Sequence, residues 1–234
     1  MTRTEAEVAQ YDVGLRQYML SVYNYMASAL ALTGLIAYAT ATYAMSNPAV
    51  ANLLFVSPLK WVIMLAPIGL VFFLAARVHA MSAGTAQATF WIYASLMGLS
   101  LASIFLVFTG QSIARVFFIT AGAFAGVSLY GYTTKRDLSG FGTFLFMGLI
   151  GIVLASIVNI FLESSALQFA ISVVGVLVFT GLTAYDTQRI KELYDELDAS
   201  DVMGKKAIMG ALTLYLDFIN LFIMLLQLFG NKNE

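Results

Sequence analysis

Residues 17–59, QYMLSVYNYMASALALTGLIAYATATYAMSNPAVANLLFVSPL, contain no charged side chain. A helix that crosses a bilayer needs about 20 mostly apolar residues, because the hydrocarbon core is about 30 Å thick and each helical residue rises about 1.5 Å. The run is long enough for more than one such helix, and the turn-forming sequence Ser46-Asn47-Pro48 divides it. It therefore predicts one membrane helix at 22–45 and the start of a second near Ser57.

The rest of the chain continues this pattern. Of its 234 residues, 60% are apolar and 11% are charged, against about 45–50% and about 25% in soluble domains. Apolar segments of spanning length, each bounded by polar or turn-forming residues, recur along the sequence. With the first helix at 22–45, the predicted spans are 57–77, 88–109, 115–133, 142–162, 167–188 and 207–229. The sequence thus predicts an all-α membrane protein, a seven-transmembrane-helix bundle in one domain at 22–229.

The distribution of Lys and Arg predicts the orientation of these spans, because cytoplasmic loops are enriched in both. An intracellular N-terminus places nine of them inside and three outside. The inner set is Arg3, Arg16, Arg77, Lys135, Arg136, Arg189, Lys191, Lys205 and Lys206, and the outer set is Lys60, Arg115 and Lys232. We therefore expect residues 1–21 to be a cytoplasmic segment and residues 230–234 to be an external tail.

Composition also excludes several functions. The chain has 12 Lys and Arg against 13 Asp and Glu, so it lacks the basic surplus that binds nucleic acid. It has no cysteine and one histidine, which excludes disulfides, thiol nucleophiles and zinc sites built from Cys and His. We expect no cofactor.

The most informative residue is Asp217, near the middle of the last predicted span. A carboxylate at that depth costs several kcal/mol unless it is neutral, paired or hydrated, so it should face the protein interior. Thr213 lies four residues before Asp217, Asn220 three residues after it and Gln227 seven residues after Asn220, so these helical spacings predict a polar interior stripe on one face. Asp217 is either a functional group or a structural one that is hydrogen-bonded to a neighbouring helix.

Two further charged residues end predicted spans. Asp186 closes the sixth span, and Arg189 follows three residues later, so an ordinary interfacial ion pair explains Asp186 as well as a functional site does. Arg77 ends the second span, where a lone arginine can extend into the lipid headgroups. The residues themselves leave both alternatives open.

Two local patterns predict packing and helix length. Gly122 and Gly126 have the GxxxG spacing that permits close helix approach, so we expect them to pack against neighbouring helices of the bundle. In residues 189–199, apolar side chains recur at amphipathic helical spacing, which predicts that the sixth helix continues into the cytoplasm. These side chains are Ile190, Leu193, Tyr194 and Leu197.

Three motifs resemble one family. They are Ser128-Leu-Tyr-Gly-Tyr-Thr-Thr-Lys-Arg-Asp-Leu-Ser-Gly140, Gly181-Leu-Thr-Ala-Tyr-Asp-Thr-Gln188 and Ala211-Leu-Thr-Leu-Tyr-Leu-Asp-Phe-Ile-Asn-Leu-Phe222. They are similar to the Bax inhibitor-1 family, also called transmembrane BAX inhibitor motif proteins, and above all to its bacterial YbhL-type members. The similarity extends through essentially all seven predicted helices.

The resemblance implies a bundle with the C-terminal helix at its centre and, for a bacterial member, a pH-sensitive calcium leak. It implies that Asp186 and Asp217 form the pair that senses and gates, with calcium as a transient ligand. It also implies that Arg77 is the latch partner of that pair. Two departures stand out: the second span has no carboxylate, and Gln227 replaces an arginine of a relative that leaks calcium.

From these observations we expect a proton-gated cation leak of the bacterial inner membrane, in contact with the lipid bilayer and with calcium ions. The alternative is a non-enzymatic regulator or scaffold that binds a membrane protease or another membrane partner. An intramembrane aspartyl hydrolase is a third possibility, but the sequences around Asp186 and Asp217 resemble the non-enzymatic family, so we expect no enzyme.

Overall fold

A computed structural model describes the backbone of residues 5–233 and the side chains of residues 11–233; Arg3, counted above as an inner-side cation, lies outside them. The described part is helical, with no strand and only an isolated bridge between Phe108 and Lys232. The elements in chain order are α1 (Glu5–Ser46), α2 (Pro48–Ala51), the π-helix η1 (Asn52–Val56), α3 (Leu59–Arg77), η2 (Val78–Ala80), α4 (Ala83–Leu101), α5 (Ile104–Val107), α6 (Gly110–Thr133), α7 (Ser139–Leu162), α8 (Ser165–Glu192) and α9 (Ser200–Phe229).

The structure confirms the prediction of seven spans. In the part of the chain that the structure describes, seven helices are long and apolar enough to cross a membrane, and each contains most of one predicted segment. They are Tyr11–Ser46, Leu59–Ala80, Ala83–Val107, Gly110–Thr133, Ser139–Leu162, Ser165–Glu192 and Ser200–Phe229. The first helix begins at Glu5, well before the predicted start at 22, because the intervening residues include no proline to end it.

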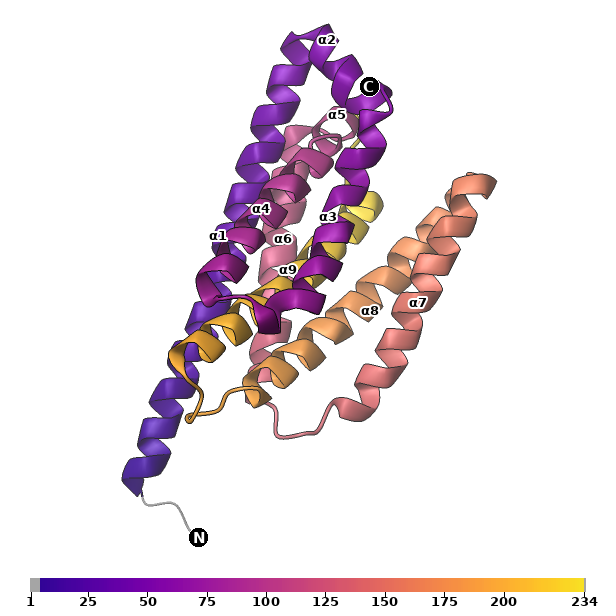
Figure 1. Cartoon of the computed structure of the whole chain (residues 1–234). Helices are drawn as coiled ribbons and strands as arrows, with labels where there is room; N and C mark the ends of the chain where they lie inside the picture. The colour runs from indigo at the N-terminus through magenta and orange to yellow at the C-terminus, as the bar shows by residue number, and fades with distance from the viewer. Residues whose placement is uncertain (1–4, 234) are drawn as a thin grey trace. The chain divides into compact units, whose positions relative to one another are not determined.

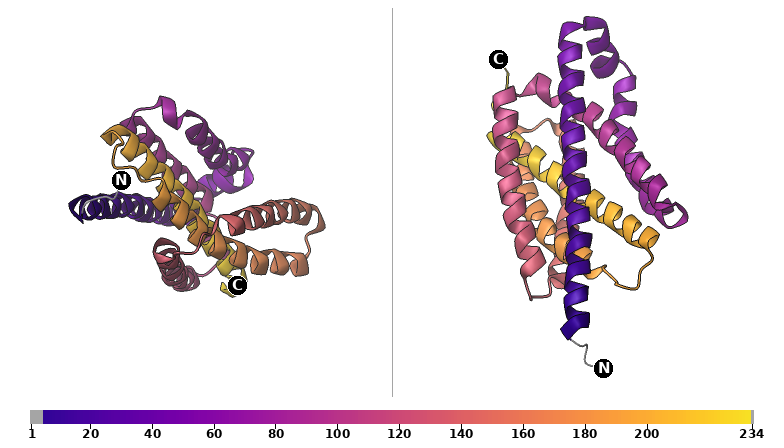
Figure 2. Two further views of the ribbon diagram at one scale, coloured as in Figure 1. Left: turned by 90° about the horizontal axis from the view of Figure 1, so that it is seen from below. Right: turned by 90° about the vertical axis from the view of Figure 1, so that its left-hand side faces the viewer.

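The chain divides into two compact units, and the first comprises residues 1–107 and 193–212. In this unit α1 is one long rod, and α2 turns the chain toward α3 (Figure 2). α4 packs against both α1 and α3. The Thr33 hydroxyl of α1 donates to the carbonyl oxygen of Ala94 in α4 over 2.9 Å. Gly98 allows this approach, since a Cβ there would lie 2.8 Å from the carbonyl oxygen of Thr33.

The second unit comprises residues 108–192 and 213–234. In it α7 and α8 run side by side as a hairpin (Figure 1), and α8 also packs against α6. Small residues make the contacts, as is usual between membrane helices. A Cβ at Gly148 would lie 2.9 Å from the Val178 side chain, and one at Gly131 would lie 2.9 Å from the backbone carbon of Ala184.

The prediction for the GxxxG pair is wrong. Nothing lies within 4 Å of a Cβ built at Gly122 or Gly126. The close approach of α6 to α8 instead occurs at Gly131, which lies on a different face of α6. A spacing of four residues gives two glycines a common face, but it does not say which face meets a neighbour.

The sixth helix continues past the predicted end of its span at 188, but it ends at Glu192 and does not include the rest of the amphipathic pattern at 189–199. Side chains in the linker bind its backbone and favour turns over helix. The Asp195 carboxylate accepts from the Leu197 N–H over 3.0 Å, and the Lys206 ammonium donates to the Leu193 carbonyl over 2.8 Å. Tyr194 packs its ring against Tyr18 of α1.

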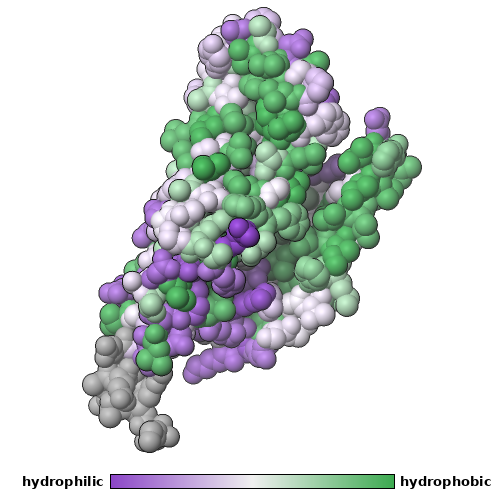
Figure 3. Space-filling model, viewed as in Figure 1, coloured by the Kyte–Doolittle hydropathy of each residue, from purple (hydrophilic) through white to green (hydrophobic). Residues whose placement is uncertain are grey.

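Burial differs greatly among the spans. In the most apolar window of each helix, 67% of the α9 residues are buried, against 17% in α7 and 11% in α3. Hydrophobic side chains cover the visible face of α7 (Figure 3). Exposed apolar helices of this length indicate contact with lipid. α9, the helix expected at the centre, contributes residues to both units.

Candidate functional site

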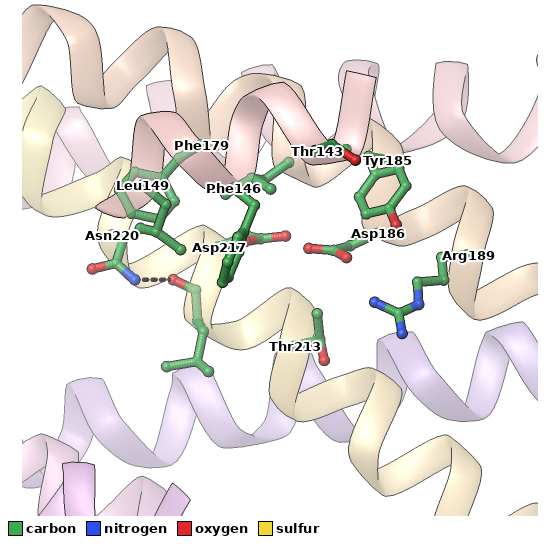
Figure 4. A pocket seen from close by; sticks show the side chains of 13 residues that line it. Thr143, Phe146, Leu149, Phe179, Tyr185, Asp186, Arg189, Thr213, Asp217 and Asn220 are labelled. Carbon is green, nitrogen blue, oxygen red and sulfur yellow. Dashed lines mark hydrogen bonds between the residues drawn. The ribbon is translucent and has the colours of Figure 1, made fainter. Parts of the chain in front are cut away.

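The candidate site is built around two carboxyl groups of the second unit. Asp186 of α8 and Asp217 of α9 point toward one another (Figure 4). Asp217 is only 5% exposed. Its Oδ2 is buried and accepts no hydrogen bond from the described residues. Two ionised carboxylates that face one another in a buried site repel, so a proton on one of them stabilises this arrangement.

The two carboxyl groups lie in a cavity of about 480 Å³. Arg189, one turn after Asp186 on α8, provides the positive charge nearest to that carboxyl group (Figure 4). Phe146 and Leu149 of α7 and Phe179 of α8 form apolar walls. The remaining lining residues are Gly142, Thr143, Leu182, Tyr185, Thr213, Leu216 and Asn220. The cavity thus holds three charged or ionisable groups beside apolar walls, at a depth where such groups are costly.

Contacts between α6 and α8 set the position of Asp186. The hydroxyls of Ser128 and Thr187 share a hydrogen bond of 2.9 Å and are buried. The Gln188 side chain accepts from the Leu138 N–H and donates to the Arg136 carbonyl, over 2.9 and 2.8 Å. These bonds are made by the two residues that follow Asp186, so they hold this part of α8 against α6 and tie the loop between α6 and α7 to the end of α8.

Beyond the cavity, the same face of α9 contacts α8 at two more positions. Met224 packs against Gly175, where a Cβ would lie 2.8 Å from its side-chain sulfur. One turn later, the Gln227 amide oxygen accepts from Gln168 over 2.6 Å and from the Ser172 hydroxyl over 2.8 Å. An apolar contact therefore separates the cavity from an amide cluster near the end of the span.

Some of the predicted site residues line the cavity and others do not. Thr213 and Asn220 line the cavity with Asp217, as the predicted stripe required. Gln227 does not belong to that interior: it is exposed and bonded in the amide cluster, because Met224 intervenes between it and the cavity. Arg77 is the last residue of α3, in the first unit, and its role as latch partner stays a prediction.

Both interpretations of Asp186 stay predictions, since its side chain faces Asp217 and also lines the same cavity as Arg189. The sequence predicted Arg189 as an inner-side cation and as a partner of Asp186 in an ion pair. Leu182, Asp186 and Arg189 are spaced four and three residues apart, so they share one face of α8. This spacing could have predicted that Arg189 lines the cavity.

The site offers few ligands for a resident metal. The described residues contain no group of three or more His, Cys, Asp or Glu side chains placed to hold an ion. Ca²⁺ prefers six to eight oxygen ligands. The cavity brings the carboxyl groups of Asp186 and Asp217 together with the side-chain oxygens of Thr213 and Asn220.

These observations define a class: an α-helical membrane protein with seven spans and a carboxyl pair within its membrane region. Comparison with known proteins gives the family. A model described as "Inhibitor of apoptosis-promoting Bax1" matches residues 15–234. The chain therefore belongs to the Bax inhibitor-1 family, as the three motifs predicted.

Relatives from several bacteria match over nearly their whole length. The chain is 50% identical to "Inner membrane protein YbhL" of Escherichia coli (strain K12), over 96% of each chain. It is 48% identical to a protein of Rickettsia prowazekii (strain Madrid E), over 99% of this chain and 96% of that one. It is 49% identical to a protein of Caulobacter vibrioides, over 95% and 92%. The names of these relatives state no enzymatic activity.

Proposed function

We propose that this protein is a proton-regulated cation leak of a bacterial inner membrane, with calcium as the favoured ion. The observation that carries the proposal is that Asp186 and Asp217 face one another in a cavity lined by residues of three membrane-spanning helices, α7, α8 and α9. Ionisable groups at this depth usually mark ion pathways or proton relays, because they are too costly to keep as packing residues.

The shared proton acts as a latch between α8 and α9. While one carboxyl group is protonated, it donates to the other and holds the two helices together. Loss of that proton leaves two negative charges in contact, and their repulsion in a poorly solvated cavity favours separation. Arg189 stabilises the Asp186 carboxylate once it is ionised, so the separated state is not left with two uncompensated charges.

The cavity is suited to cations. Opening exposes carboxylate oxygens together with the polar oxygens of Thr213 and Asn220, and hard divalent cations prefer such ligands. The unpartnered Oδ2 of Asp217 supplies a free acceptor at the centre of the site.

The proposal is tested by calcium flux into proteoliposomes loaded with a calcium-sensitive dye, between pH 5 and pH 8. We expect flux through the wild-type protein to rise as pH rises and the latch loses its proton. Asp217→Asn keeps the shape of the side chain but cannot lose a proton, so its flux should not change with pH. Flux no faster than in protein-free liposomes at every pH would overturn the proposal and favour a scaffold that captures a membrane protease or another partner.

The location and orientation belong to the same proposal. The name of the Escherichia coli relative, an inner membrane protein, supports the location, and the asymmetry of Lys and Arg supports an N-terminus inside and a C-terminus outside. A reporter fused after Glu234 should read as external, and one fused in the loop at 135–138 should read as cytoplasmic. A cytoplasmic signal from a stable C-terminal fusion would contradict this orientation.

A further inference from the structure

A second cavity lies in the first unit, where α3 begins and α4 ends. Its volume is about 340 Å³, within the range of small-molecule sites. Leu54 and Phe55 of η1 cover it, and apolar side chains of α3 and α4 form most of its walls. The complete lining is Leu54, Phe55, Lys60, Trp61, Ile63, Met64, Leu99, Ser100 and Ser103.

The segment that covers this cavity has an unusual backbone. Residues Asn52–Val56 form a π-helix, a conformation that is rare and is frequent at functional sites. It follows α2, whose first turn is capped by the Asn47 side chain through the N–H groups of Ala49 and Val50. Together α2 and η1 carry the chain from the end of one span to the start of the next, at the level of the membrane surface.

Lys60 gives the cavity a positive charge that lacks a local counterion. There is no Asp or Glu between Asp12 and Asp137 in the sequence. Within the described residues, the contact recorded for the Lys60 ammonium is the Trp61 ring, 5.4 Å from its centroid. A cation over a tryptophan at the end of a membrane span is placed for a headgroup phosphate.

We propose that this cavity binds one anionic phospholipid. Its phosphate pairs with the Lys60 ammonium at the rim, near the hydroxyls of Ser100 and Ser103, and an acyl chain enters between Phe55, Met64 and Leu99. The adjoining face of α3 is already exposed to lipid, since Val62 and Leu65 are 61% and 53% exposed. A lipid is the partner whose charge and apolar length match both parts of this cavity. The proposal is independent of ion flux.

Native mass spectrometry of the purified full-length protein tests it, by titration with dioleoyl phosphatidylglycerol and, separately, dioleoyl phosphatidylcholine. We expect the wild type to bind one phosphatidylglycerol more tightly than phosphatidylcholine. Lys60→Gln should weaken phosphatidylglycerol binding about fivefold, the typical effect of one basic side chain at an anionic surface, and Lys60→Arg should restore it. Ser103→Leu should weaken both lipids, because the larger side chain fills the cavity.

Lys232→Gln is the matched control, because it removes another lysine at the end of a span but outside the cavity. It should bind both lipids as the wild type does. Equal losses from Lys60→Gln and Lys232→Gln would overturn the proposal, as would unchanged binding by Ser103→Leu. A dimer that Ser103→Leu dissociates, without any change in lipid binding, would overturn it in favour of a second copy of the chain. Thermal unfolding of each variant checks that it is folded.

Discussion

Gly131→Ala should destabilise the protein by separating α6 from α8. The added Cβ would lie 2.9 Å from both the carbonyl carbon and the Cα of Ala184 and closer still to the carbonyl oxygen. Ordinary carbon–oxygen contacts are about 3.3–3.6 Å. The obstacle is backbone rather than the end of a flexible side chain, so the helices themselves must move apart.

The magnitude follows from three contributions. Overpacking typically costs about 1–3 kcal/mol. Loss of the adjacent Ser128–Thr187 hydrogen bond adds about 0.6 kcal/mol, the average for such bonds between membrane helices. Alanine regains up to about 1 kcal/mol of helix propensity. The net loss is about 2 kcal/mol, or about 4–8 °C in the melting temperature for a chain of this size.

Gly126→Ala is the matched control, since it lies on the same helix with nothing within 4 Å of its Cβ. It should melt at the wild-type temperature or slightly above it. The assay is thermal unfolding in lipid nanodiscs, followed by circular dichroism. Melting temperatures for the two variants within about 1 °C of each other would refute the close approach at Gly131 and with it the register that places Asp186.

Three other substitutions test separate parts of the account. Met224→Ala removes the side chain that packs on Gly175, so calcium flux in liposomes should rise at every pH; unchanged flux would show that this contact is not a barrier. Glu163 ends α7 with a left-handed φ of 49°. Glu163→Gly should stabilise the protein by about 1 kcal/mol, because glycine adopts this conformation without strain. If Glu163→Gly melts no higher than Glu163→Ala, this explanation is contradicted. Arg189→Gln should shift the rise in flux to higher pH, since the Asp186 carboxylate loses its stabilising cation, and an unchanged pH profile would exclude that role.

Much of the fold followed from the sequence because the bilayer imposes a simple rule on it. Long apolar segments with few charges located all seven spans, and Ser46-Asn47-Pro48 correctly marked the end of α1. The errors concern features that depend on neighbouring elements. Gly122 and Gly126 were expected to pack, whereas Gly131 does, and local spacing contains no information about which face meets another helix.

The candidate site was predictable in part. The cost of a charge in the membrane placed Asp217 in the interior, and helical spacing placed Thr213 and Asn220 beside it. The contact with Asp186 was not derivable from spacing, because a linker of irregular turns separates α8 from α9. Gln227 has the correct spacing for the stripe, but the bulk of Met224 separates it from the cavity, and sequence periodicity does not reveal such a barrier.

The central claim is that Asp186 and Asp217 work as one unit through a shared proton. The most direct test is calcium flux as a function of pH for Asp186→Asn, Asp217→Asn and the double variant, in the same liposomes as the wild type. Residues that act as one unit give non-additive effects, so each single variant should lose the pH dependence and the double variant should match them. Single-variant effects that sum to the effect of the double variant would contradict the shared-proton latch and return Asp186 to an ion pair with Arg189.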